Sequence, residues 1–165
     1  MDLLDSLEDE GTENLKNRFF GIWRGIVSNV NDPLGLGRIK AKVHELLGDN
    51  EETDWASYCS PFGGGGHGWF FPPSAGSPGT GDPVWIMFEA GDLNRPVWVG
   101  FWFNQTDRAP TGANKDVRVL ETRSGHRLEF HDQAGKEKVV VKDKVGQTVE
   151  LECSKGEVKI TANQK

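Results

Sequence analysis

The stretch that decides the fold is Gly81–Trp102, with the sequence GDPVWIMFEAGDLNRPVWVGFW. Two apolar runs, Val84–Phe88 and Val97–Phe103, flank a connection rich in Gly, Asp, Asn and Pro, and this pattern predicts a strand, a turn and a strand. Both alternating sets of side chains are apolar, whereas a half-solvated hairpin places a polar residue at every second position. We therefore expect a barrel core on one side of this hairpin and a second buried surface on the other.

Composition and charge narrow the class of protein. The 165 residues include 21 Gly and 8 Pro, and 36% are hydrophobic, which suits a turn-rich β protein better than a helix bundle. Residues 1–17 hold six acidic residues and one Lys, so they account for −5 of the net charge of −6 and leave the rest of the chain at −1. A near-neutral body lacks the basic surface of a nucleic-acid-binding protein, and the acidic start is unlike a signal peptide.

Further strands are predicted before the hairpin. Phe19–Val30 and Trp55–Cys59 are short apolar or aromatic runs, and Arg38–Val43 alternates strictly between apolar and basic residues. Gly68–Phe71 adds a short extended piece after the glycine run Gly63–Gly66. About five strands joined by Gly/Pro loops predict an all-β fold whose N-terminal part is an OB-fold, a five-stranded Greek-key barrel.

The C-terminal part shows an internal repeat. Gly125, Gly135, Gly146 and Gly156 lie 10 or 11 residues apart, and four alternating segments lie beside them. One face of the predicted four-stranded meander is apolar, formed by Leu128, Phe130, Val139, Val141, Val149, Leu151, Val158 and Ile160. Nothing in the same repeat covers this face, so it must pack on the barrel or on copies of the chain. The ladder runs on without closing a core, which favours copies, and three ladders can form a β-prism around one axis.

These patterns predict four regions. Residues 1–17 form an acidic tail or short helix, 18–103 the barrel, 104–116 a linker and 117–165 a needle whose core is the eight apolar residues above. Trp85, Met87, Trp98 and Trp102 lie in strands without interleaved Lys or Arg, which favours a barrel interface between subunits over a stacking platform for bases or sugars.

For each group of residues that could bind a phosphate or act as a catalytic acid, a structural role explains the sequence better. The Gly63–Gly66 run lacks the Gly-Lys-Ser/Thr of a phosphate loop, so a flexible barrel loop is expected. The acidic cluster of Glu51, Glu52 and Asp54 lies in a hydrophilic stretch with nothing to raise a pKa.

The histidines and cysteines give the same result. His44, His67, His126 and His131 lack metal-ligand spacing, although His126 and His131 flank one strand where a ring around a threefold axis is an alternative. Cys59 and Cys153 are expected to be buried free thiols. We therefore predict no catalytic residue, cofactor or metal, and no enzymatic activity.

An ordered series of motifs resembles the phage baseplate spike family, also called baseplate assembly protein V, to which the VgrG spikes of type VI secretion are related. The motifs are Asp32-Pro33 with Gly35-x-Gly37-Arg38, Gly81-Asp82-x-Val84 with Phe88-Glu89-x-Gly91-Asp92, Arg95-Pro96-Val97-Trp98-Val99-Gly100, and Ser124-Gly125-His126. Together they cover about residues 19–142.

This resemblance implies a mechanical function. It implies a homotrimer of OB-fold barrels continued by a triple-stranded β-prism, which closes the tube of a contractile tail and pierces the target cell envelope. The implied partners are a baseplate hub protein and the tail tube, and the implied location is the virion baseplate or a contractile injection particle made in the bacterial cytoplasm. The chain lacks the His-x-His motif with which many short spikes end, so a separate PAAR-like tip protein or an apex without metal is expected.

Two other functions remain as alternatives. An OB-fold binding module for nucleic acid or oligosaccharide would be a monomer with a ligand site, and the near-neutral body argues against it. An envelope-degrading enzyme would need a poised acid, base or nucleophile, and the sequence offers none with a partner.

Overall fold

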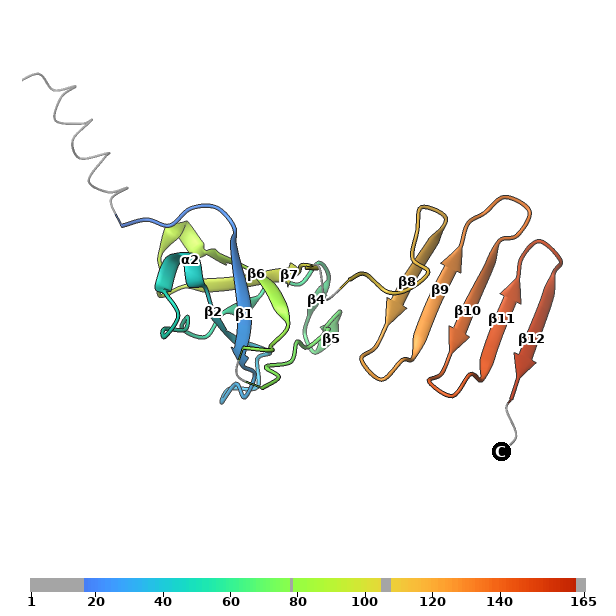
Figure 1. Cartoon of the computed structure of the whole chain (residues 1–165), viewed down its shortest axis with the longest axis horizontal. Helices are drawn as coiled ribbons and strands as arrows, with labels where there is room; N and C mark the ends of the chain where they lie inside the picture. Colours follow the sequence, from blue (N-terminus) through green and yellow to red (C-terminus); the bar gives the residue numbers. More distant parts are fainter. Residues whose placement is uncertain (1–16, 78, 105–107, 163–165) are drawn as a thin grey trace, which may run out of the picture. The chain divides into compact units, whose positions relative to one another are not determined.

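The computed structural model describes residues 17–77, 79–104 and 108–162. The chain forms two compact units, Met1–Trp102 and Phe103–Lys165, each of which is described by itself (Figure 1). The predicted acidic tail, residues 1–17, lies almost wholly outside the described residues. No helix among the described residues combines the length and the apolarity needed to cross a membrane.

The first unit is built on a five-stranded sheet with the order β2-β1-β6-β7-β3. Its strands are β1 (Trp23–Asn29), β2 (Lys40–Lys42), β3 (Ser57–Tyr58), β6 (Pro83–Phe88) and β7 (Pro96–Phe101). The unit also contains the one-turn helix α2 (His44–Leu47), the 3-10 turn η1 (Glu89–Gly91), and the short strands β4 (Gly63–Gly64) and β5 (His67–Gly68).

The sheet closes into a barrel. All pairs within it are antiparallel except β3 with β7, which is parallel. An antiparallel bridge between Ile39 and Ala56, which adjoin β2 and β3, joins the two ends of the sheet. Five strands in this order, with one parallel pair, form the partly open Greek-key barrel of the OB-fold.

The barrel core confirms the predicted alternation in the second strand. Ile39, Ala41 and Val43 point inward and are fully buried, while Arg38, Lys40 and Lys42 lie on the opposite face. The buried core consists of Val27, Ile39, Ala41, Val43, Ala56, Val84, Ile86, Phe88 and Trp98.

The structure corrects the prediction for Trp98, because this side chain is 0% exposed and lies in the barrel core. Trp85 is opposite Gly100 but Ile86 is opposite Trp98, so Val99 is an extra residue in β7, a β-bulge. The bulge reverses the alternation and turns Trp98 inward, where it stacks on Tyr58 with 4.2 Å between ring centroids. Trp98 therefore contributes to the core of one barrel and presents no surface to a partner.

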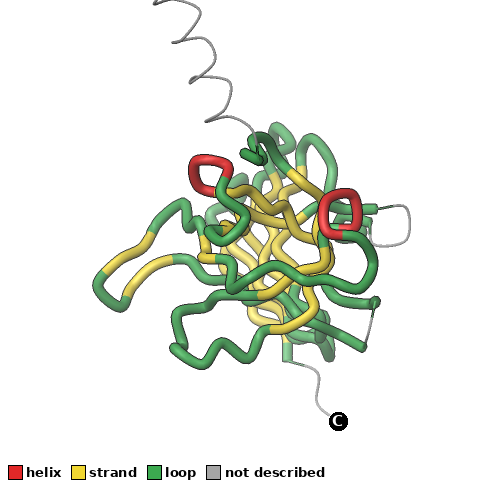
Figure 2. Tube along the Cα trace, turned by 90° about the vertical axis from the view of Figure 1, so that its left-hand side faces the viewer, coloured by secondary structure: helices red, strands yellow, loops and turns green. Residues whose placement is uncertain are grey.

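The glycine run after β3, predicted as a flexible barrel loop, has a regular conformation. Gly63 pairs with Gly68 and Gly64 with His67, which leaves Gly65 and Gly66 as a two-residue turn. Their φ angles of 56° and 82° are those of a type I′ turn, which requires positive φ at both central positions. The run is therefore the tip of a β-hairpin, which stands out from the rest of the trace in Figure 2.

The second unit is a single five-stranded antiparallel meander, with β8 to β12 in chain order. The strands are β8 (Val117–Glu121), β9 (Arg127–His131), β10 (Lys138–Lys142), β11 (Thr148–Glu152) and β12 (Glu157–Thr161). The last four correspond to the predicted repeat. The first, β8, was not predicted as part of it, because no glycine at the repeat spacing precedes it.

Both cysteines are free, as predicted, but neither is buried. Cys59 follows β3 and Cys153 follows β11, and both are exposed. Each lies one residue beyond the end of its strand, and Cys153 shares the exposed face of Leu151.

Candidate assembly surfaces

The apolar face of the C-terminal sheet is a strip two side chains wide. The register places Phe130, Val139, Leu151 and Val158 opposite one another in one row. Leu128, Val141, Val149 and Ile160 form the neighbouring row. We call these eight residues the apolar strip. Directly opposed residues of neighbouring antiparallel strands share one face, so the register brings all eight predicted residues onto a common surface.

The strand that the repeat did not reveal extends both rows. Leu120 of β8 lies opposite Leu128, and Arg118 lies opposite Phe130. Arg118 forms an ion pair with Asp132. One row of the strip thus begins with a paired cation rather than with an apolar side chain.

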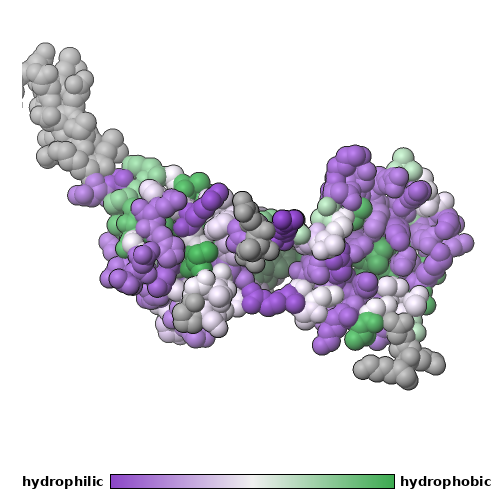
Figure 3. Space-filling view, in the orientation of Figure 1, coloured by the Kyte–Doolittle hydropathy of each residue, from purple (hydrophilic) through white to green (hydrophobic). Residues whose placement is uncertain are grey.

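The strip is open in the single chain. Six of its eight residues are exposed, from 41% for Val149 to 76% for Ile160, and only Leu128 and Val139 are half-buried. Among the described residues of this unit, Val140 alone is buried. Hydrophobic residues accordingly reach the surface between hydrophilic ones in Figure 3. The described residues of this unit therefore give the sheet no hydrophobic core of its own.

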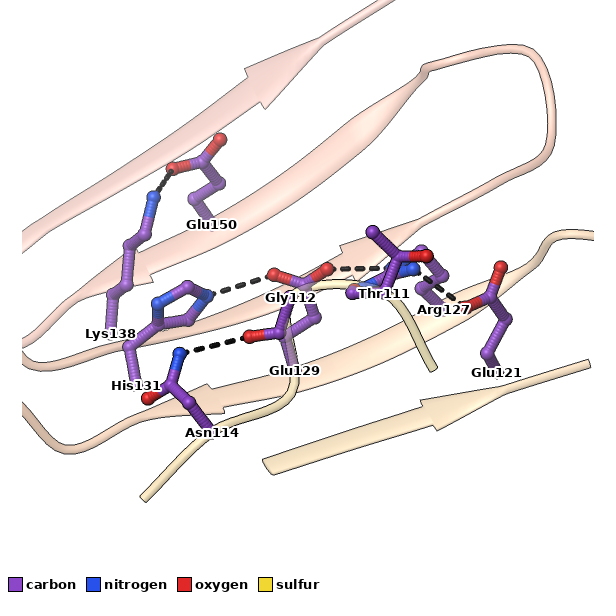
Figure 4. Close-up of polar contacts among 9 residues, drawn as sticks. All are labelled: Thr111, Gly112, Asn114, Glu121, Arg127, Glu129, His131, Lys138 and Glu150. Carbon is purple, nitrogen blue, oxygen red and sulfur yellow. Dashed lines mark hydrogen bonds and ion pairs between the residues drawn. The ribbon is translucent and has the colours of Figure 1, made fainter. Parts of the chain in front are cut away.

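The opposite face of the sheet carries a network of charges, drawn in Figure 4. Arg127 is the centre of it, donating to Glu129 at 2.7 Å, to Glu121 at 2.6 Å and to the carbonyl of Thr111 at 2.8 Å. His131 lies 2.8 Å from the other oxygen of Glu129. Burial raises the pKa of Glu129, but hydrogen bonds from His131 and Arg127 outweigh it and hold that pKa below its ordinary value.

Further charges are paired across the strands of this face. The amino group of Lys138 lies 3.1 Å from Glu150. Glu152 is held by Lys155 and Lys159, whose hydrogen bonds lower the pKa of Glu152 to about 2. The network confirms that His131 does not share a face with the apolar strip, so the described register gives no histidine ring that includes it.

The outer face of the barrel is aromatic. Trp85 and Trp102 lie there with ring centroids 6.2 Å apart, and Met87 is exposed beside them on β6. Arg24 of the neighbouring strand β1 places its guanidinium 4.9 Å from the Trp102 ring centroid and 5.7 Å from that of Trp85. We call Arg24, Trp85, Met87 and Trp102 the outer aromatic face. The sequence patterns did not identify Arg24, because it lies on a strand that is distant in the chain. Only the pairing of β1 with β6 brings its guanidinium close to both indole rings.

The Asp32–Arg38 loop is a rigid structural element. The Asp32 carboxylate accepts hydrogen bonds from the backbone N–H groups of Leu34, Leu36 and Arg38. It also receives the Arg38 guanidinium at 2.6 Å, which holds the pKa of Asp32 far below its usual range. A shallow apolar pocket of about 300 Å³ lies beside this loop, against Phe70 and Pro72. Both oxygens of the Asp32 carboxylate accept hydrogen bonds within the loop, so Asp32 has a structural role and is not a candidate acid or base.

Neither Glu52 of the predicted acidic cluster nor a metal site offers a centre for chemistry among the described residues. Glu52 bonds to Lys40 and Ser28, and the hydrogen bond from Lys40 lowers its pKa, the opposite of what a catalytic acid needs. Among the described residues, no group of three or more His, Cys, Asp or Glu side chains is arranged to hold a metal ion.

The basic residues near Trp55, which is half-buried, are paired with carboxylates. Arg38 and Lys40 lie 5.7 and 5.6 Å from the Trp55 ring centroid. Their charges are neutralised by Asp32 and Glu52, respectively. A track for single-stranded nucleic acid needs unpaired cations beside its aromatic rings, and these two cations are committed to carboxylates.

The strand order and the closure of the first unit define an OB-fold barrel. Residues 23–103 match the family model of the type VI secretion system/phage-baseplate injector OB domain, so this part of the chain belongs to that domain family. The match confirms the resemblance found in the motifs around Asp32–Arg38 and Gly81–Gly100. It indicates a structural role among the baseplate components of a phage tail or a secretion machine.

Proposed function

We propose that this chain is the central spike of a contractile tail or injection machine, assembled as a homotrimer. In this proposal the barrel closes the tail tube, and three C-terminal sheets turn their apolar strips toward one axis to form a β-prism that pierces the target envelope. The function is mechanical, and no step of it requires catalysis. The hub protein, the tail tube and a tip protein are its proposed neighbours.

One observation carries the proposal: among its described residues the C-terminal unit buries a single side chain, while its sheet exposes a continuous apolar strip. A five-stranded sheet without a second layer is marginal in water, because burial of its apolar face supplies most of its stability. Its polar face is occupied by paired charges, so the strip is the surface that remains to be covered. Copies of the chain as the cover, and three as their number, are what the resemblance to the baseplate spike family implies.

The charge ladder of the opposite face fits the outside of such a prism. Lys138 with Glu150, and Glu152 with Lys159, join neighbouring strands in a direction that crosses the sheet. Exposed pairs of this kind contribute little stability each, but they satisfy the surface charges of a rod and keep its sheets from stacking through their outer faces.

Immunogold electron microscopy of purified contractile particles tests the placement. An antibody against this chain should label the centre of the baseplate at one end of the particle. Labelling along the sheath, or particles that lack the chain altogether, would contradict the proposal. The alternative of an OB-fold ligand-binding module predicts no label on particles and a monomeric chain.

A further inference from the structure

A second exposed apolar surface lies on the hairpin that contains the glycine run. We call residues 60–73, which include β4 and β5, the arm. Its rings are exposed, with 58% for Phe62, 60% for Trp69 and 43% for Phe71. The sequence contains no Asp, Glu, Lys or Arg from Ser60 to Gly81, so nothing charged accompanies these rings. An apolar surface of this kind on a loop marks an interaction site.

The base of the arm is fixed by its own contacts. The hydroxyl of Ser60 donates to the carbonyls of Phe62 at 2.7 Å and Trp69 at 3.0 Å, and the two strands are joined by a backbone bond from Trp69 to Phe62. Phe70 packs so closely on Gly37 that a Cβ there would lie 2.8 Å from the ring. The arm is therefore anchored at Phe70.

The rings beyond this anchor contact one another. Trp69 meets Phe71 edge-on with centroids 5.8 Å apart, and Phe62 meets His67 at 5.6 Å. None of the ring contacts given by the described residues joins Phe62, Trp69 or Phe71 to the outer aromatic face of the same barrel. The arm thus carries two ring pairs, Phe62 with His67 and Trp69 with Phe71, and the three large aromatic side chains among them are exposed.

The outer aromatic face has the matching chemistry. The Arg24 guanidinium lies over two indole rings and forms no ion pair with a described carboxylate. A cation in this setting favours further aromatic rings over its other side, since each ring adds attraction without requiring an opposite charge. Met87 beside it offers an adaptable thioether that packs well against ring edges.

We propose that the arm of one copy packs on the outer aromatic face of a neighbouring barrel in the trimer. This inference rests on the proposed function, because a prism of three C-terminal sheets tethers three barrels through short linkers. Tethering raises the effective concentration of neighbouring barrels to the millimolar range, so a modest contact is populated. The occupant is a second copy of this chain because both surfaces are present in every copy and their chemistry is complementary. The arm offers uncharged aromatic rings, and the one charge of the outer aromatic face, Arg24, is a cation that already lies over two indole rings.

The area is adequate for such a contact. Three aromatic side chains bury roughly 200 Å² each when fully covered, and with about half of that exposed they offer roughly 300 Å² per arm. That is a substantial part of the roughly 800 Å² that each partner gives to a standard interface. The arm therefore adds a contact between barrels that the prism already holds close to one another.

Disulfide trapping in the full-length chain tests the contact. Both native thiols are removed by Cys59→Ser and Cys153→Ser, and two differently tagged chains are then co-expressed. One carries Trp69→Cys in the arm and the other carries Met87→Cys on the outer aromatic face. Mild oxidation should produce a covalent dimer that contains both tags on a denaturing gel, and reduction should abolish it.

Matched controls keep the outcome unambiguous. Glu45→Cys, an exposed position in α2, replaces Met87→Cys in a parallel experiment and should give no mixed dimer with Trp69→Cys. Phe62→Cys replaces Trp69→Cys if that variant misfolds. Trimers by sedimentation without the mixed dimer would overturn the arm contact and leave the proposed spike intact, whereas monomers by sedimentation would overturn both.

Discussion

The substitution Val141→Asp tests whether the apolar strip is the core of an assembly. Val141 lies on β10, the middle strand of the sheet, opposite Leu128 and Val149. Its side chain is 52% exposed in one chain, so a single sheet in water would tolerate a carboxylate there. In a prism the same position is sealed at the axis, and three carboxylates would meet.

The expected cost follows from this burial. Losing the remaining apolar burial of one Val removes about 1 kcal/mol, since full burial of such a side chain is worth about 1.5–3 kcal/mol. A buried carboxylate either stays charged at a cost of several kcal/mol or takes up a proton. Protonation at pH 7 from a reference pKa of about 3.9 costs about 4 kcal/mol and sets the upper limit. The sum is about 5 kcal/mol per chain and about 15 kcal/mol per trimer, comparable to the total stability of a domain.

Sedimentation velocity and thermal melting provide the measurement. Val141→Asp should abolish the trimer, whereas Thr148→Asp, on the opposite face of the next strand and opposite Lys142, should leave it intact. A Val141→Asp variant that sediments as a trimer with an unchanged melting temperature would refute the reasoning.

Three further predictions concern the barrel and the thiols. Ala90 adopts a positive φ of 51°, which favours glycine, so Ala90→Gly should stabilise the barrel by about 1 kcal/mol in urea unfolding; a destabilised variant would contradict this. Asp32 has a lowered pKa, so its contribution is complete above a pH of about 4 and is lost as the pH falls below that value; the melting temperature of Asp32→Asn should therefore depend less on pH between about 5 and 2 than that of the parent. Cys153 continues the face of the apolar strip at the end of β11, so a thiol reagent should modify Cys59 faster than Cys153 in the assembled protein, and equal rates would argue against a covered strip.

Much of the fold could be predicted from the sequence, because a strand with one buried face has an apolar residue at every second position. The strict alternation around Ala41 identified its inward face, and the repeat after Gly125 placed eight apolar residues on one face of a sheet whose register bears this out. In both segments hydrophobic burial acts on every second residue, and no local irregularity disturbs the count.

The outward positions of β7 were not predictable in the same way. A single extra residue, Val99, shifts the alternation and sends Trp98 into the core, and an apolar run of Val, Trp and Phe carries no mark of where a bulge falls. The first strand of the C-terminal sheet, β8, was missed because Val117–Glu121 lacks the preceding glycine that marked the others.

The surfaces depended on pairing between distant segments. Arg24 meets Trp85 only because β1 pairs with β6, and Arg127 meets Thr111 because a loop folds over the sheet. The glycine run indicated flexibility by composition, but two consecutive positive φ angles and a paired Gly63–Gly68 make it a defined turn. Contacts of this kind are properties of the folded chain and leave no local pattern in the sequence.

The central claim is that the C-terminal sheet completes its core with copies of itself. Sedimentation equilibrium of the full-length chain at low micromolar concentration tests it most directly. The account predicts a single species of three times the 18.3 kDa chain mass, stable on dilution. A monomer under these conditions would contradict it.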